Sequence, residues 1–157
     1  MPDTPAPAFF QQQHALLDTA LQAHLLALVG GEFGPALAWF TQWQQATLAH
    51  IATEDQYLLP HVPQGARWAA RVYRLEHERI ALLAEDYAAQ LQAVACAPPP
   101  DAPGQRLAVL TLLDAVHALR HVLEHHHLRE EQALAQELPL AVQQAAWTAP
   151  GLTEAGH

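Results

Sequence analysis

Residues 112–133 read LLDAVHALRHVLEHHHLREEQA, and this stretch decides the fold that the sequence predicts. Its apolar residues recur at alternating steps of three and four, which is the spacing of one face of an α-helix. The same face continues into His126 and Glu130, so an imidazole and a carboxylate extend the apolar stripe. The sequence therefore predicts a long helix whose buried face carries ionisable side chains.

Sparse proline and glycine residues divide the chain into four such segments. They run from about Phe9 to Val29, from Gly34 to before Pro60, from about Ala66 to Ala95, and from near Gly104 to before Pro139. All four are rich in good helix formers, and none alternates like a strand. We predict an all-α, up-down-up-down antiparallel four-helix bundle over residues 9–139. Residues 140–157 are expected to form a short C-terminal extension, with a helix over Ala141 to Trp147.

The composition excludes several classes of protein. With 7 basic residues against 16 acidic ones and a net charge of −9, the chain has no basic cluster to bind the phosphates of a nucleic acid. The longest apolar run is too short to span a membrane, and the amino-terminal residues lack the features of a secretory signal. We therefore expect a cytoplasmic protein, whose single Cys96 cannot form an internal disulfide.

Histidines are the most informative residues. There are 11 in the chain, and the apolar stripe of each long segment carries one of them: His14, His50, His77 and His126. Glu54 and Glu130 follow two of these histidines by four residues, which places each pair on one helix face. Buried carboxylates are costly unless they are paired, and four imidazoles with two carboxylates suit two transition-metal ions.

The depths of these side chains along the helices also agree. At about 1.5 Å per residue, His14 and His50 lie at one level on antiparallel helices, and His77 lies close to that level. His126 agrees to within about one turn. We therefore predict one metal-binding layer in the core, formed by His14, His50, Glu54, His77, His126 and Glu130.

Each of these residues taken alone has a less specific interpretation. A single histidine on an apolar stripe is more often a hydrogen-bonded core residue than a metal ligand. His50 and Glu54 alone would fit a helix-surface ion pair as well as a metal site. The conjunction of four in-phase histidines with two His-x-x-x-Glu pairs is what favours the metal site.

Other candidate residues are given structural roles. Four histidines off the core stripe are expected to be solvated rather than to form an auxiliary metal site: His117, His121, His125 and His127. Two others have no carboxylate partner in phase: His24 and His61. Two tyrosines on core stripes are expected to pack with a satisfied hydroxyl, with tuning of the centre as the alternative: Tyr57 and Tyr73. Four tryptophans are expected in the core or in helix contacts: Trp39, Trp43, Trp68 and Trp147.

The strings around the histidines resemble a known family. Residues 50–60, HIATEDQYLLP, closely resemble the second-helix motif of hemerythrin-like (HHE cation-binding) domains, and residues 126–134, HHLREEQAL, resemble the fourth-helix copy. Residues 75–79, LEHER, and residues 14–18, HALLD, are similar to the third-helix and first-helix motifs. The resemblance covers about residues 9–139.

This resemblance implies a non-haem centre of two iron ions, with zinc or manganese as alternatives. The two glutamates, Glu54 and Glu130, would bridge the ions, with an oxo or hydroxo ligand between them. By the family's pattern, one ion would take His14 and His50 and the other would take His77 and His126.

Two departures separate the chain from the oxygen-carrying hemerythrins. Tyr73 stands where those proteins have a further third-helix histidine, and Glu130 follows His126 by four residues where they have an aspartate after five. Both departures favour the bacterial HHE and iron-centre-repair branch.

The expected function is binding or sensing of oxygen, nitric oxide or redox state, with a small diatomic or peroxide ligand. The alternatives are an enzyme that reduces peroxide or nitric oxide or repairs iron centres, and a metal-storage or structural site.

Overall fold

The computed structural model describes residues 8–148, and every regular element in that range is helical. The elements are α1 (Phe9–Val29), α2 (Phe33–Thr53), η1 (Glu54–Leu58), η2 (Leu59–His61), α3 (Ala70–Cys96), α4 (Ala102–Arg129), η3 (Glu130–Leu134), α5 (Ala135–Glu137) and α6 (Leu140–Trp147). The predicted all-α class is confirmed over this range. Residues 149–157 of the predicted C-terminal extension lie outside the described residues.

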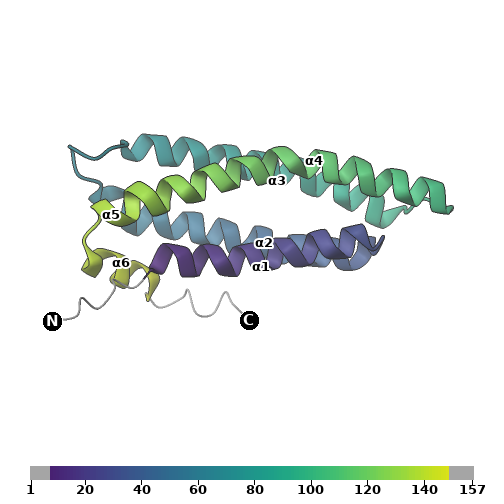
Figure 1. The fold of residues 1–157 in the computed structure, drawn as a ribbon, viewed down its shortest axis with the longest axis horizontal. Helices are drawn as coiled ribbons and strands as arrows, with labels where there is room; N and C mark the ends of the chain where they lie inside the picture. Colours follow the sequence, from purple (N-terminus) through teal and green to yellow (C-terminus); the bar gives the residue numbers. More distant parts are fainter. Residues whose placement is uncertain (1–7, 149–157) are drawn as a thin grey trace.

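The four long helices lie lengthwise in the molecule. Figure 1 shows α1, α2, α3 and α4 along its longest axis, and α6 at the end where α1 begins. α1 packs against α2 and α4, and α3 packs against the same two helices. α6 contacts α1 and η1. Within residues 8–148, none of the helices combines the length and the hydrophobicity that crossing a bilayer requires.

Short-range signals set two of the helix ends. Gly31, in the turn after α1, has a φ of 72°, a left-handed conformation that glycine adopts without steric cost. Asp101 precedes α4, and its carboxylate accepts a hydrogen bond of 2.7 Å from the backbone N–H of Gly104. This cap satisfies one of the N–H groups that the first turn of a helix leaves without a partner.

The third helix begins later than predicted. It starts at Ala70, whereas the sequence predicts a start near Ala66. The preceding segment is held in a different way, because the backbone N–H of Arg67 donates to the Glu137 carboxylate at 2.7 Å. Ala69 has extended backbone angles, so the helix cannot reach further back.

Two π-helical segments alter the predicted stripes. η1 starts at Glu54 and η3 starts at Glu130, so each begins at the glutamate of a His-x-x-x-Glu pair. A π-helical turn holds one residue more than an α-helical turn, which rotates the residues that follow about the helix axis. The prediction that Tyr57 lies on the buried stripe is therefore wrong. Tyr57 is 43% exposed, and Leu58 is fully buried in its place.

The buried apolar residues form two clusters at different heights along the helices. The larger cluster includes Leu17, Trp43, Ile80 and Leu123. The smaller cluster includes Phe10, Leu58, Tyr73, Leu134 and Trp147. On each long helix, the predicted ligands fall between a residue of one cluster and a residue of the other. The six residues thus form a polar layer between two apolar clusters.

Candidate metal centre

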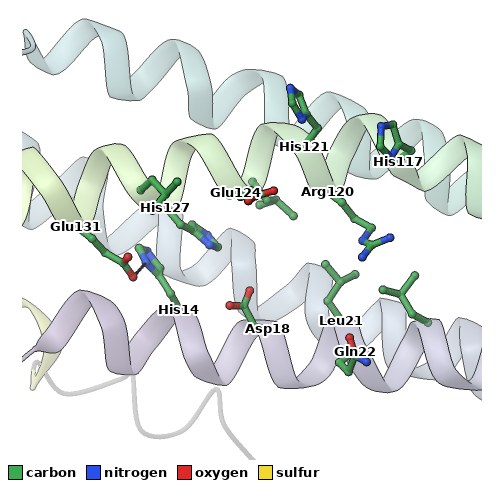
Figure 2. Close-up of a pocket in the computed structure, with 13 residues that line it drawn as sticks. His14, Asp18, Leu21, Gln22, His117, Arg120, His121, Glu124, His127 and Glu131 are labelled. Carbon is green, nitrogen blue, oxygen red and sulfur yellow. Dashed lines mark hydrogen bonds and ion pairs between the residues drawn. The ribbon is translucent and has the colours of Figure 1, made fainter.

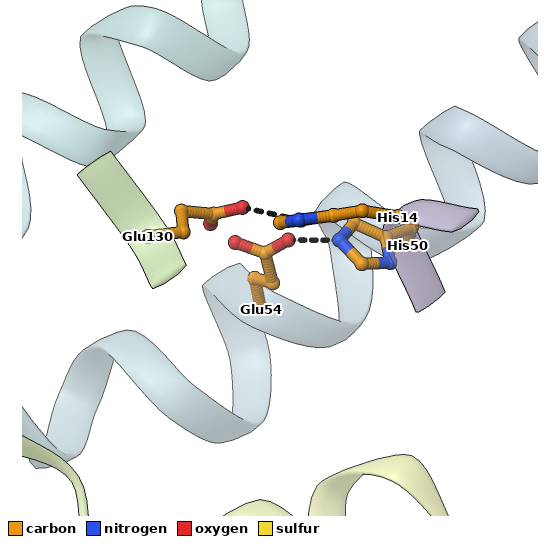
Figure 3. Close-up of side chains that lie close together, drawn as sticks. All are labelled: His14, His50, Glu54 and Glu130. Atoms are coloured by element: carbon orange, nitrogen blue, oxygen red, sulfur yellow. Dashed lines mark hydrogen bonds and ion pairs between the residues drawn. The ribbon is translucent and has the colours of Figure 1, made fainter. Parts of the chain in front are cut away.

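The structure brings the six predicted ligands together in the core. None is more than 6% exposed. They form two groups, each of which could hold a metal ion with ligand atoms within 4.8 Å of one another: His14, His50, Glu54 and Glu130 in the first, and Glu54, His77, His126 and Glu130 in the second. Figure 3 shows the first group, with the two carboxylates facing the two imidazole rings. Both groups contain both glutamates.

Each glutamate faces two histidines, one from each group. The Glu130 carboxylate lies 3.0 Å from Nε2 of His14 and 3.3 Å from Nε2 of His126. The Glu54 carboxylate is paired with His50 and lies 3.3 Å from Nε2 of His77. The inner nitrogens of the four rings thus converge on two carboxylates, and each carboxylate can span both groups.

Three of the four histidines are held from behind by a second carboxylate. Nδ1 of His14 lies 3.0 Å from the Glu131 carboxylate. Nδ1 of His77 lies 2.8 Å from Asp55, and Nδ1 of His126 lies 3.2 Å from Glu76. A carboxylate accepts from an N–H, so each contact favours a proton on Nδ1 and a lone pair on Nε2. That lone pair points into the polar layer, as a metal-ligating histidine requires.

His50 is held differently. Its Nδ1 has no hydrogen-bond partner among the described residues, and its ring stacks on Trp147 of α6 with centroids 4.7 Å apart and planes 22° apart. His14 carries a stacked ring in addition to its carboxylate, because His127 lies over it at 3.8 Å and 12°. Both histidines of the first group therefore contact an aromatic face.

The charges of the layer are coupled. Burial alone would raise the pKa of Glu54, but the imidazoles of His50 and His77 hold it well below its usual value. Burial also works against a charge on His77, yet its pKa is raised because Glu54 and Asp55 face it. For His14, burial and the neighbouring rings of His127 and His50 lower the pKa to about 2. Glu54 is thus held ionised and His14 neutral, which are the protonation states that bind metal ions, whereas a metal ion would have to displace a proton from His77.

Several buried polar atoms of this layer form no hydrogen bond among the described residues, although Glu54 lies at ion-pair distance from His50 and His77. They are both ring nitrogens of His50, both carboxylate oxygens of Glu54, Nε2 of His77 and one oxygen of Glu130. Buried polar groups are almost always satisfied, so such a concentration calls for an explanation. Imidazole nitrogen and carboxylate oxygen are ligands for divalent transition metals, and a cation among these atoms would satisfy them. The residues present therefore fit a metal ion.

The remaining histidines divide by surroundings. His117, His121 and His125 are exposed, as predicted, whereas the prediction that His127 is solvated is wrong. His127 is half-buried, because its ring stacks on the ring of His14 from α1. His24 is a hydrogen-bonded core residue, with Nδ1 2.7 Å from the Ala36 carbonyl and Nε2 2.6 Å from the Tyr87 hydroxyl: its partners are Ala36 and Tyr87.

The tyrosine and tryptophan predictions hold only in part. Tyr73 is fully buried as predicted, but its hydroxyl has no partner within the described residues, contrary to expectation. Trp43 and Trp147 are buried, while Trp39 is 40% exposed. Trp68 is half-buried and lies under the guanidinium of Arg129, 4.2 Å from the ring centroid.

The outer carboxylates were not predicted from the sequence. Asp55 and Glu131 directly follow the two core glutamates, and Glu76 directly precedes His77. An acidic residue next to a predicted ligand in the sequence is the signal that could have identified them. Successive residues of a helix point about 100° apart, so such a neighbour can reach around to the back of a histidine on the adjacent helix.

A scan against protein-family models, a search of curated proteins and a search of solved structures each found no match to this chain. The hemerythrin-like resemblance therefore stays a prediction. What the structure establishes is a buried cluster of histidines and glutamates that could hold a metal ion.

Proposed function

We propose that this chain is a hemerythrin-like protein that binds two iron ions and uses them to bind or sense oxygen, nitric oxide or redox state. One observation carries the proposal: two groups of four ligands share both glutamates, and each glutamate faces one histidine of either group. Two carboxylates common to two ligand sets are suited to bridging a pair of ions.

The fold that we propose is an up-down-up-down antiparallel four-helix bundle over residues 9–139. Two observations support it. Each long helix packs against the next one in the sequence, and α1 packs against α4. In Figure 1 the sequence colours progress in opposite directions along neighbouring long helices. In that arrangement one ligand layer can draw a histidine from every helix.

The donor set favours iron, with zinc or manganese as alternatives. Each group offers two imidazole nitrogens and two carboxylates, which leaves coordination positions for a small diatomic or peroxide ligand if the ion is six-coordinate. Iron bound there would supply reversible redox chemistry. The protein's own contribution is to aim the Nε2 atoms inward, to keep Glu54 ionised and to exclude bulk water between the two apolar clusters.

A second candidate is an enzyme that reduces peroxide or nitric oxide or that repairs iron centres. One observation favours it. The hydroxyl of Tyr73, one helical turn before His77, is fully buried and has no hydrogen-bond partner within residues 8–148, and burial raises its pKa to about 12. A protonated phenol can donate a hydrogen bond, which is the role that we propose for Tyr73 in such an enzyme.

Iron content is the decisive measurement. Metal-free protein reconstituted anaerobically with Fe²⁺ is expected to hold close to two irons per chain. A His50→Ala/His126→Ala double variant, which removes one histidine from each group, is expected to lose most of that iron. His125→Ala is the matched control, because His125 is an exposed histidine of the same helix. Equal iron in the parent and the double variant would reject the proposed centre.

Reaction with the ligand separates the two functions. An oxygen-dependent or nitric-oxide-dependent absorption change that reverses without turnover supports binding or sensing. Sustained consumption of peroxide or nitric oxide with an added reductant, reduced in a Tyr73→Phe variant, supports the enzyme. Bound zinc with no response to either ligand would instead indicate a structural site.

A further inference from the structure

A groove between α1 and α4 leads to the polar layer. It has a volume of about 570 Å³, and one of the residues that line it is His14, a predicted ligand. Figure 2 shows the groove with the side chains of α1 below and those of α4 above. Since none of the six ligands is more than 6% exposed, a metal ion needs a path through the protein surface to reach them.

The polar side chains that line the groove change from exposed to buried toward the end at His14. Asp18 of α1 and Glu124 of α4 are exposed. His127 and Glu131 are half-buried, and His14 is buried. Every one of these side chains offers a carboxylate oxygen or an imidazole nitrogen, which are the donor atoms that divalent transition metals take. A neutral diatomic gas does not require carboxylate or imidazole groups along its path.

His127 and Glu131 mark the inner end of the groove. The ring of His127 stacks on His14 at 3.8 Å, and the carboxylate of Glu131 lies 3.0 Å from Nδ1 of the same His14. Figure 2 places His127 and Glu131 beside His14 on facing helices. An ion that reaches these two side chains is therefore in contact with the first residue of the centre.

Two other cavities in the described part of the chain do not reach a ligand, although Glu131 lines one of them. One lies between the start of α1 and α6, and the other lies beside Trp68 and Arg129. None of the six ligands lines either cavity. The groove between α1 and α4 differs from both because it combines metal-binding side chains with contact to the centre.

We propose that the groove between α1 and α4 is the path by which divalent metal ions reach the buried centre. The exposed carboxylates of Asp18 and Glu124 attract the ion, and His127 with Glu131 passes it to His14. This inference rests on the proposed metal centre and adds the route of loading. Arg120 also lines the groove and places a positive charge there, which opposes the approach of a cation.

The rate of metal loading tests the route. Cobalt(II) is a suitable probe, because it takes the same donor atoms and its visible absorption reports coordination. Stopped-flow mixing of cobalt(II) with metal-free protein is expected to be about ten-fold slower for an Asp18→Asn/His127→Gln variant, with the same final cobalt content. Arg120→Gln is expected to load faster than the parent. His125→Gln is the matched control, because His125 is exposed on α4 but does not line the groove.

The outcomes separate the route from the centre. A parent chain that binds no cobalt overturns the proposed function and the route with it. Normal binding at unchanged rates in the groove variants overturns the route alone. The route is also overturned if the His125→Gln control slows as much as the groove variant. A lower final cobalt content in the groove variant would likewise overturn it, because Asp18 or His127 would then be a ligand. Circular dichroism of each variant verifies that it is folded.

Discussion

The two ligand groups of the polar layer differ in what holds their histidines. In the second group, His77 and His126 are anchored by the carboxylates of Asp55 and Glu76, and Glu76 is itself fixed by Arg129 at 3.2 Å. In the first group, an aromatic ring stacks on each histidine; His14 also contacts the Glu131 carboxylate at Nδ1, whereas His50 has no hydrogen bond at Nδ1 among the described residues. The first group is also the one that the proposed loading groove reaches, because His14 lines that groove.

The difference shows that the same ligands can be supported in two ways. A hydrogen bond to Nδ1 fixes both the tautomer and the direction of the lone pair on Nε2. A stacked ring fixes the plane of the imidazole but leaves its tautomer free. We infer that the second group is the more rigid side of the centre, and that the first group is the more adaptable side because His50 lacks such a hydrogen bond. Three predictions test the centre, beginning with the largest effect, and a fourth tests a histidine outside it.

Glu54→Gln should have the largest effect, because Glu54 belongs to both groups. An amide is neutral and a poorer ligand, so we expect the variant to lose both ions rather than one. Iron content after anaerobic reconstitution is the measurement, and Glu85→Gln, at an exposed position of α3, is the control. Retention of one full equivalent of iron would show that the two groups do not depend on a common carboxylate.

Removal of an outer carboxylate should be the next largest effect. Asp55→Asn or Glu76→Gln weakens the anchor of a histidine in the second group, and such changes typically cost about 10- to 100-fold in metal affinity. Competition with a chelator measures that affinity. Glu78→Gln on α3 is the control, because Glu78 is exposed and forms no hydrogen bond or ion pair with the centre among the described residues. Unchanged affinity in both variants would show that the hydrogen bonds are not what holds these rings.

Replacement of the stacked ring should have a smaller effect on affinity. Trp147→Phe keeps an aromatic face against His50, and we expect a loss of less than about ten-fold, confined to one of the two ions. Trp147→Ala removes the face and should affect that ion more strongly. Stepwise titration with cobalt(II) distinguishes one weakened ion from two. Equal weakening of both ions in these variants would contradict the distinction between the groups.

A histidine outside the centre provides the smallest effect. Burial lowers the pKa of His24, and its hydrogen bond with the Ala36 carbonyl only partly offsets this. The folded chain then binds fewer protons than the unfolded chain once the pH falls below about 6.5, the ordinary value for histidine. His24 therefore contributes little pH dependence well above this value and destabilises the fold on acidification, by at most about 1.4 kcal/mol per pH unit.

Urea unfolding of the metal-free protein between pH 7 and pH 5 measures this contribution. His24→Gln should show a shallower fall of the free energy of unfolding than the parent. His61→Gln is the control, because His61 is exposed. Parallel curves for the parent and His24→Gln would show that His24 becomes charged in the folded protein.

The sequence predicted much of this arrangement because helical periodicity is a local property. The spacing of Leu112, Val116, Leu119 and His126 alone identifies the buried face of α4. The same periodicity failed at Tyr57, because it assumes an α-helix and the chain forms a π-helical segment there.

Contacts between helices were harder to predict. His127 is off the apolar stripe of its own helix. Its burial depends on the ring of His14 from α1, which the periodicity of α4 does not reveal. The carboxylate of Glu76 likewise acts on a histidine 50 residues further along the chain. Such roles depend on how neighbouring helices face each other, and a single sequence does not contain that information directly.

The position of the polar layer between two apolar clusters has a consequence for how the helices align. Leucine-rich helices can slide past one another by a whole turn and still find apolar neighbours. In this chain, a slide of one turn would bring the Glu54 or Glu130 carboxylate against the apolar residues of one cluster, and an unpaired buried charge costs several kcal/mol. The layer therefore destabilises packings in which one helix is shifted along another, and it favours a single register for all four helices.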